Sequence, residues 1–514
     1  MQERVCPREC RWRVVLWRVL LAALGVGLAI GPRASVADAQ ADGYDVVLRG
    51  GRVIDPETGL DAVRNIGVRD DRIVEITEEP LEGRDVVDVS GLVVAPGFID
   101  LHAHGQTNQA NEFQAHDGVT TALELESGQP FVDVWLASRT GNALIHFGAT
   151  IGHSSVRWRA MEKYADQTVE ATRIVGDERL ESDALAGVAR ATANARYEAL
   201  TAAELVVMRD GLARGLADGA LGIGVPVGYY PGATREEIFR VYAFAAEHAV
   251  PVFTHVRNVT LDAIQEAIAD AAVTGAPLHI VHLNSMALGD IGVALEMVAA
   301  AQRQGLDITT EVYPYTAAST GLATTLFDPG WQERMGISYN DLQWVATGER
   351  LTEETFASYR EEGGTVIIHL MKPEWIEQGV RSPVTMIGSD GMPYAPGAHP
   401  RSAGTFARVL GRFVREAGAL TLTDALAKIT LRPAQRLEDI APSMRLKGRL
   451  QVGCDADITV FDPDTIIDTA TFEADLSFSE GVHHVLVGGT FVVRDSETVE
   501  GVYPGRAVLG RYRQ

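Results

Sequence analysis

The stretch Val94-Ala-Pro-Gly-Phe-Ile-Asp-Leu-His102-Ala-His104 is an apolar segment that ends in two histidines. In an extended strand, residues two positions apart point to the same side, so both imidazoles can face one point at the strand end. Imidazole nitrogen is a preferred ligand of zinc. The stretch therefore predicts a buried strand, over residues 94–102, whose end carries part of a metal site.

Further apolar segments follow this one and alternate with helical stretches such as 235–248 and 261–274. This alternation is typical of repeated βα units around a parallel sheet. The eight predicted strands cover residues 94–102, 119–125, 145–151, 221–227, 252–255, 278–282, 308–312 and 384–387. Eight such units predict an α/β fold, a (β/α)8 TIM-like barrel, in which functional groups gather at the carboxyl ends of the strands.

Other predicted strands also end in residues that bind metals. His255 ends the fifth strand, His282 ends the sixth, and Asp390 follows the eighth. A single histidine of this kind is more often a hydrogen-bonded core residue, but four at matched strand ends suit a dinuclear metal site. Asp390 can bind a metal and take a proton from water, so we predict it as the general base.

A pair of metal ions usually needs a shared anionic ligand. No predicted barrel strand contains a lysine or Cys454, which removes two kinds of bridging ligand. The second strand carries Glu124 and Glu126 at its carboxyl end, and both face the same way. We predict Glu126 as the bridging ligand and keep Glu124 as the alternative.

The two chain ends share a pattern that differs from the barrel. Residues 44–55, 64–77, 456–462 and 482–494 alternate apolar and polar side chains between turn residues. We predict one small β-sandwich domain, built from 42–93 and 440–505, beside a barrel that spans 94–439. Residues 316–383, which are richer in charge, predict an insertion that is either a lid over the pocket or a peripheral embellishment.

The first 39 residues resemble a leader for export. Several arginines precede an apolar run over 19–30, and small residues follow around Ala37 and Ala39. This order is typical of a Sec-type signal peptide, and the run is shorter than the roughly 20 residues of a spanning helix. We expect a periplasmic or secreted protein with no stable membrane anchor.

Composition excludes one class of partner. The chain has 514 residues and a formal net charge of −24, whereas nucleic-acid binding needs a basic surface. Once a leader with Cys6 and Cys10 is removed, only Cys454 remains, so no intrachain disulfide is expected.

With these motifs in place, the chain resembles the amidohydrolase superfamily, and within it the N-acyl-D-amino-acid deacylase (D-aminoacylase) group, over essentially the whole mature sequence. The resemblance rests on Val94 to His104, Gly118-Val-Thr-Thr121, Gly219-Ala-Leu-Gly222, Tyr230-Pro-Gly232, Thr254-His-Val-Arg257, Val312-Tyr-Pro-Tyr-Thr316, Gly388-Ser-Asp-Gly391, His399-Pro-Arg401-Ser-Ala-Gly-Thr-Phe406 and Gly453-Cys-Asp-Ala-Asp457-Ile-Thr-Val-Phe461.

The resemblance implies roles for individual residues. The metal histidines fall on His102, His104, His255 and His282, and the catalytic aspartate on Asp390. The contacts to the substrate carboxylate fall on Tyr313, Ser319 and Arg401, although Arg401 could equally form a salt bridge within its loop. We further predict Arg257 and His153 as substrate contacts. A metal, together with His153 or Tyr313, would stabilise the oxyanion, and the alternative for His153 is a structural role.

Two positions depart from the group. Its usual cysteine ligand is replaced by Ser127, and its usual lysine after the sixth strand is replaced by Asn284. The hypothesis is a hydrolase with one or two zinc ions that deacylates N-acyl-D-amino acids, a small-molecule substrate. The alternatives are a cyclic-amide hydrolase of dihydroorotase or hydantoinase type, a hydrolase of N-acyl-L-amino acids or dipeptides, and, least favoured, a non-catalytic metal-binding protein.

Overall fold

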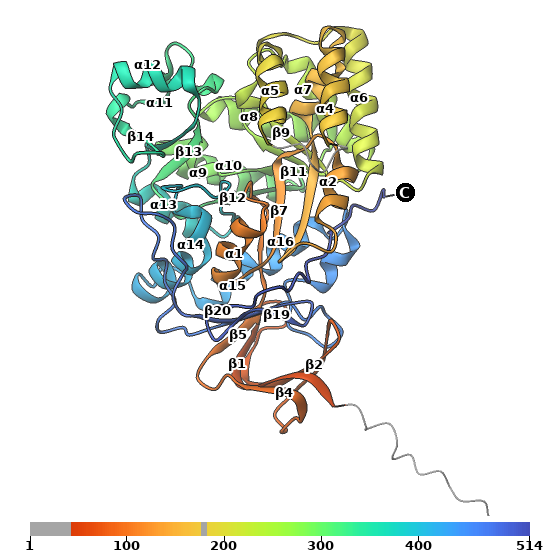
Figure 1. Cartoon of the computed structure of the whole chain (residues 1–514), viewed down its shortest axis with the longest axis vertical. Coiled ribbons are helices and arrows are strands. Elements are labelled where there is room, and N and C mark those ends of the chain that lie inside the picture. The colour runs from red at the N-terminus through yellow and green to blue at the C-terminus, as the bar shows by residue number, and fades with distance from the viewer. Residues whose placement is uncertain (1–42, 176–181, 514) are drawn as a thin grey trace, which may run out of the picture. The chain divides into compact units, whose positions relative to one another are not determined.

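The structure is a computed structural model that describes residues 43–175 and 182–513. The predicted leader, residues 1–39, lies outside the described residues. At the centre is a parallel sheet whose strands follow one another in chain order around a barrel (Figure 1). Its strands are β6 (Phe98–Asp100), β7 (Val119–Gln129), β8 (His146–Gly152), β9 (Ile223–Pro226), β10 (Val252–His255), β11 (Leu278–Ile280), β12 (Ile308–Val312) and β16 (Thr385–Ile387).

These eight strands match the eight that the sequence predicts, so the (β/α)8 barrel is confirmed. The last and first strands meet through side chains and a single bridge rather than a full ladder. Ala103 and Gly391 form a parallel bridge, and Ser389 N donates to Asp100 Oδ1 at 3.0 Å. The barrel therefore closes next to the two histidines that follow β6.

The first predicted strand, 94–102, divides in two. Its beginning is β5 (Val93–Pro96), which pairs with a different sheet, and only β6 belongs to the barrel. Pro96 has no N–H for a continuing ladder, and the N–H of Gly97 donates to Asp457 O at 2.8 Å. A Cβ on Gly97 would lie 2.2 Å from Thr120 Oγ1, so only glycine permits this close crossing.

Helices cover the outside of the barrel. They are α1 (Asn108–His116), α2 (Val132–Arg139), α3 (His153–Ala160), α6 (Ala202–Ala217), α7 (Arg235–Glu247), α8 (Leu261–Thr274), α9 (Leu283–Ala287), α10 (Ile291–Arg303), α13 (Pro373–Arg381), α14 (Arg401–Arg408), α15 (Leu422–Ile429) and α16 (Leu431–Leu437). α10 shows why they pack there, because Ile291, Leu295 and Val298 recur at helical spacing and are buried. The segment Leu283–Arg303 is apolar and long enough to span a membrane, but half of the most apolar part of this segment is buried inside the protein.

Two insertions interrupt the barrel and lie at the end away from the β-domain (Figure 1). The first, between β8 and β9, carries α4 (Ala165–Val175) and α5 (Ser182–Ala191) and was not predicted from the sequence. The second falls within the predicted 316–383 and carries β13 (Ala317–Gly321), α11 (Trp331–Met335), β14 (Leu342–Trp344), α12 (Glu353–Glu362) and β15 (Thr365–His369). Its three strands form a separate sheet, and the insertion has its own hydrophobic core. Movement as a lid stays a prediction.

The chain ends form one β-domain, as predicted. Its strands are β1 (Tyr44–Asp55), β2 (Leu60–Arg69), β3 (Arg72–Thr77), β4 (Gly83–Asp88), β5, β17 (Ile458–Phe461), β18 (Val482–Val487), β19 (Thr490–Arg494) and β20 (Glu497–Thr498). β17 pairs with β5, which joins the two ends into one connected sheet that branches at β1. A hydrophobic core drawn from both ends, separate from the barrel core, fills the domain.

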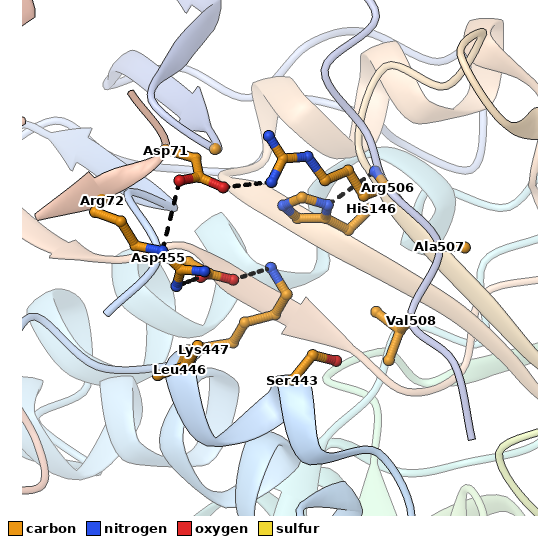
Figure 2. Close-up of a pocket in the computed structure, with 11 residues that line it drawn as sticks. Asp71, Arg72, His146, Ser443, Leu446, Lys447, Asp455, Arg506, Ala507 and Val508 are labelled. Atoms are coloured by element: carbon orange, nitrogen blue, oxygen red, sulfur yellow. Dashed lines mark hydrogen bonds and ion pairs between the residues drawn. The ribbon is translucent and has the colours of Figure 1, made fainter. Parts of the chain in front are cut away.

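A network of charged residues fastens the β-domain to the barrel (Figure 2). Lys447 Nζ lies 2.6 Å from Asp457 and 2.8 Å from Asp455, and His146 Nε2 lies 2.9 Å from Asp457. Burial lowers the pKa of Lys447, but the two aspartates outweigh it and raise that pKa overall. The cavity beside the network has a volume of about 140 Å³. Every charge in this core of the network is paired, so we assign it a structural role.

Candidate metal centre and active site

Four histidines converge at the carboxyl ends of the barrel strands. They form two pairs: His102 Nε2 lies 3.3 Å from His104 Nε2, and His255 Nδ1 lies 3.1 Å from His282 Nε2. His282 has a φ of 32°, and Asp390, which lies beside the first pair, has a φ of 51°. Such left-handed conformations are costly for residues other than glycine and tend to occur at functional sites.

Glu126 lies between the two pairs. Its Oε2 is 3.5 Å from His102 Nε2 and 3.3 Å from His104 Nε2. Its Oε1 is 3.0 Å from His255 Nδ1 and 3.1 Å from His282 Nε2. One oxygen therefore faces each pair, which is the placement expected of a bridging carboxylate.

Glu124 has a different position. Its Oε2 lies 2.8 Å from His104 Nδ1, and its Oε1 accepts a hydrogen bond from Ser127 N at 3.1 Å. It therefore contacts the side of the imidazole that faces away from Glu126. The geometry favours Glu126 over Glu124 as the bridge.

Asp390 completes the centre. Its Oδ1 lies 3.4 Å from both His102 Nε2 and His104 Nε2, and its Oδ2 lies 3.0 Å from Arg401 Nη1. Burial alone would raise the pKa of Asp390, but Arg401 and His102 hold it well below its usual range. The carboxylate is therefore ionised and directed toward the histidines.

We call these residues the histidine–carboxylate cluster: His102, His104, Glu126, His255, His282 and Asp390. The ligand atoms of His102, His104 and Asp390 lie within 4.8 Å of one another, and so do those of His102, Glu126 and His282. Zinc accepts imidazole nitrogen and carboxylate oxygen at about 2.0–2.2 Å, so such spacings fit a shared ion. Buried carboxylates also require countercharge. The donor set fits one or two divalent metal ions.

Two carboxylates orient the histidine rings from behind. Glu311 Oε1 lies 2.5 Å from His102 Nδ1, and its Oε2 lies 3.2 Å from His279 Nε2, while Glu124 holds His104. Burial would raise the pKa of Glu311, but His102 lowers it to about 2. Because these contacts occupy the Nδ1 atoms, the Nε2 atoms of His102 and His104 face the centre. Glu311 was not among the predicted site residues, although it is a lone carboxylate within a buried barrel strand.

Arg401, Tyr313 and Ser319, the predicted contacts to the substrate carboxylate, lie together beside Asp390. The Arg401 guanidinium lies 4.8 Å from the centre of the Tyr313 ring, and its Nη2 donates to Ser319 O at 3.3 Å. Within the described residues, the Tyr313 hydroxyl, the Ser319 hydroxyl and Arg401 Nε are buried without a hydrogen-bond partner. Buried polar atoms are normally satisfied, so these donors point to an anionic ligand.

A cavity of about 420 Å³ opens onto the cluster. Its wall includes His104, Glu126, His282, Ser319 and Asp390. This volume suits a small molecule. The other lining residues are Ser127, Ser154, Arg196, Pro226, Tyr229, Tyr230, Thr320, Thr324, Met392 and Pro393. Ser319, Thr320 and Thr324 show that the second insertion forms part of the wall.

The structure does not bring Arg257 or His153 into this cavity. Arg257 Nη2 lies 2.8 Å from Glu266, and its Nη1 donates to Ala233 O at 2.7 Å. His153 is fully buried, and its Nε2 lies 2.8 Å from Glu237 Oε1. Each side chain has a carboxylate partner that its local sequence does not reveal.

Asn284, which follows the sixth barrel strand, supports Tyr313. Its Nδ2 donates to Tyr313 O at 3.1 Å, and its Oδ1 accepts from Tyr313 N at 3.4 Å. Asn284 therefore fixes the backbone of a residue beside the pocket instead of supplying a cation.

A barrel that gathers histidines and carboxylates at its strand ends, beside a cavity, has the layout of a metal-dependent hydrolase. The chain belongs to the amidohydrolase family, whose sequence model matches residues 85–493. It is 31% identical over 496 residues to a D-aminoacylase from Alcaligenes xylosoxydans xylosoxydans, covering 91% of this chain and 98% of the relative.

Solved structures are similar over the same extent. N-acyl-D-glutamate deacylase from Bordetella bronchiseptica, complexed with zinc and a phosphonate mimic of the tetrahedral intermediate, has 27% identity and a TM-score of 0.77. A D-aminoacylase with a binuclear metal centre has 26% identity and a TM-score of 0.74. Each comparison covers 91% of this chain and 100% of the other.

Proposed function

We propose that this protein is a metal-dependent deacylase that hydrolyses the amide bond of N-acyl-D-amino acids. The observation that carries the proposal is that two sites lie next to each other. Asp390 belongs to the histidine–carboxylate cluster and also contacts Arg401. Arg401, Tyr313 and Ser319 each have a buried donor without a hydrogen-bond partner among the described residues. The relatives named D-aminoacylase and N-acyl-D-glutamate deacylase support this substrate class.

The cluster would hold one or two zinc ions. Glu126 would bridge, with His102, His104 and Asp390 on one side and His255 and His282 on the other. When bound, zinc would act as a Lewis acid and lower the pKa of a water molecule. Glu311 and Glu124 keep the rings of His102 and His104 turned toward the centre.

The remaining steps belong to the protein's own side chains. Arg401, Tyr313 and Ser319 bind the α-carboxylate of the substrate, because a guanidinium and two hydroxyls complement a carboxylate. Asp390 accepts a proton as water adds to the acyl carbon and passes it to the amide nitrogen. The new C–O bond forms and the C–N bond breaks, which releases a carboxylic acid and a free amino acid.

Metal removal and a substrate panel test the proposal. We expect purified protein to contain zinc and to release D-amino acids from N-acetyl-D-amino acids, because the donor set fits zinc. Dialysis against a chelator should abolish turnover, and added zinc should restore it. Elemental analysis and amino-acid release are the measurements.

The same panel includes N-acetyl-L-amino acids and hydantoins. Hydrolysis of hydantoins alone would contradict the proposed substrate and favour a cyclic-amide hydrolase. Activity on L-substrates alone would retain the barrel chemistry and reject the D-preference. Bound zinc without any turnover would indicate a non-catalytic metal-binding protein.

We also propose that the protein is exported to the periplasm or secreted, with residues 1–39 as a cleaved signal peptide. The supporting observation is the order of arginines, apolar run and small residues in the sequence. Expression of the full chain in a bacterium should place the protein in the periplasmic fraction, with a new N-terminus near Gln40. Recovery of uncleaved protein in the cytoplasm would reject export.

A further inference from the structure

Arg196 is a cation in the wall of the active-site cavity. Its side chain is half-buried, and no carboxylate among the side chains that the structure describes, in residues 43–174 and 187–513, forms an ion pair with it. The acids that line the same cavity, Glu126 and Asp390, already contact histidines or Arg401. The Arg196 guanidinium is therefore available to pair with an anionic group of a ligand in the cavity.

A buried ion pair holds the backbone on either side of Arg196. Arg157 Nη1 donates to Ala195 O and its Nη2 donates to Glu198 O, while its Nε lies 2.8 Å from Glu237 Oε1. Arg157 and Glu237 are at most 1% exposed. A buried ion pair costs desolvation energy, so it is a poor source of stability but a strong constraint on geometry.

Two further contacts complete this support. Gly232 N donates to Arg196 O at 2.7 Å, which ties the turn to the loop after β9. A Cβ on Gly232 would lie 2.4 Å from Glu198 N, so the two loops approach as closely as glycine allows. The turn over Ala193–Tyr197 is therefore fixed, and the Arg196 side chain starts from a defined position. Such preorganisation reduces the entropy lost on binding an anion.

Arg196 cannot be the main contact for the α-carboxylate if Arg401 has that role. Arg401 comes from α14, is fully buried, and lies against Asp390 and Tyr313. Arg196 comes from the first insertion, between β8 and β9, and reaches the cavity from a different loop. The Arg196 guanidinium thus lies in the cavity wall, and the Arg401 guanidinium lies buried behind the wall residues Asp390 and Ser319.

We propose that Arg196 binds a second carboxylate of the substrate, so that the preferred substrates are N-acyl-D-amino acids with an additional anionic group. This inference rests on the proposed deacylase function. The second carboxylate can belong to the amino-acid side chain, as in glutamate, or to the acyl group, as in succinyl. The shared chemistry is a dicarboxylate that spans both arginines.

Two pairs of matched substrates test the inference and distinguish the sources. N-acetyl-D-glutamate is compared with N-acetyl-D-glutamine, and N-succinyl-D-alanine with N-succinamoyl-D-alanine. We expect kcat/KM to be about tenfold to hundredfold higher for the anionic member of one pair, the range given by a hydrogen bond to a charged group. The pair that shows the preference identifies where the carboxylate lies.

Variants then assign the preference to Arg196. Arg196→Met should remove it, mainly by raising KM for the anionic substrate, and leave kcat/KM for the neutral substrate within twofold. Arg196→Lys should retain part of the preference. Arg190→Met is the matched control, since Arg190 is exposed on α5 and does not line the cavity. The control should behave as wild type.

Three results would overturn the inference. Equal kcat/KM within both pairs for the wild type would reject it while leaving the deacylase function intact. An equal loss on neutral and anionic substrates in Arg196→Met would show that Arg196 only supports the fold. No hydrolysis of any of the four substrates, with zinc bound, would reject the proposed function and the inference with it.

Discussion

Asp390→Asn should lower kcat for N-acyl-D-amino acid hydrolysis by about a thousandfold, within the range of roughly 10²–10⁴ for loss of a general base. The asparagine amide has nearly the same shape as the carboxylate but cannot take a proton from water. Its neutral side chain would also leave the buried Arg401 without its anionic neighbour. Steady-state kinetics on the substrate that the panel identifies would measure the loss.

Because Asp390 would also bind a metal, the zinc content of Asp390→Asn must be measured together with its activity. The measurement separates loss of the base from loss of the metal. Elemental analysis should show at least one zinc ion still bound, since Glu126, His255 and His282 are unchanged. Asp439→Asn is the control, because the Asp439 side chain is 92% exposed, and its activity should equal wild type. Activity of Asp390→Asn within tenfold of wild type would contradict the base role.

Glu126→Gln should lower kcat/KM by more than about 100-fold and reduce the zinc bound per chain. Even partners outside the ligand shell typically cost 10–100-fold when removed, and a bridging ligand should cost more. Each oxygen of Glu126 faces one histidine pair, and an amide replaces one of these oxygens with a nitrogen that cannot serve as an anionic ligand. Kinetics and zinc content after dialysis are the measurements.

The matched variant is Glu124→Gln, two residues earlier on the same strand. Glu124 contacts His104 Nδ1 rather than the centre, so its loss should misorient one ring, keep the zinc, and cost only about 10–100-fold. The opposite result, with zinc lost from Glu124→Gln and kept by Glu126→Gln, would place the bridge on Glu124.

The barrel and the main cluster were predictable because their signals are local. Each buried strand is a short apolar run, and parallel strands bring their carboxyl ends to one face, so His255 and His282 had to meet. The division of the first strand was not predicted, because Pro96 and Gly97 are also compatible with a local irregularity within one continuous strand.

The partners of individual charged residues were not predictable from sequence. Glu311 contacts His102 across 209 positions, and His153 finds Glu237 84 positions away. Nothing in the local sequence distinguishes a histidine that faces a cavity from one that faces a buried carboxylate. The choice between Glu124 and Glu126 also depended on which rings each oxygen faces, which is a property of the packed strand ends.

The sheet that joins the chain ends also governs how the protein can be made. β5 pairs with β17, which the ribosome delivers only after every barrel strand. Until then the edge of β5 presents unpaired backbone groups and apolar side chains, and such edges promote aggregation of incomplete chains. A premature stop after α14 would therefore leave the whole histidine–carboxylate cluster in place and still produce a chain whose β5 lacks its partner β17.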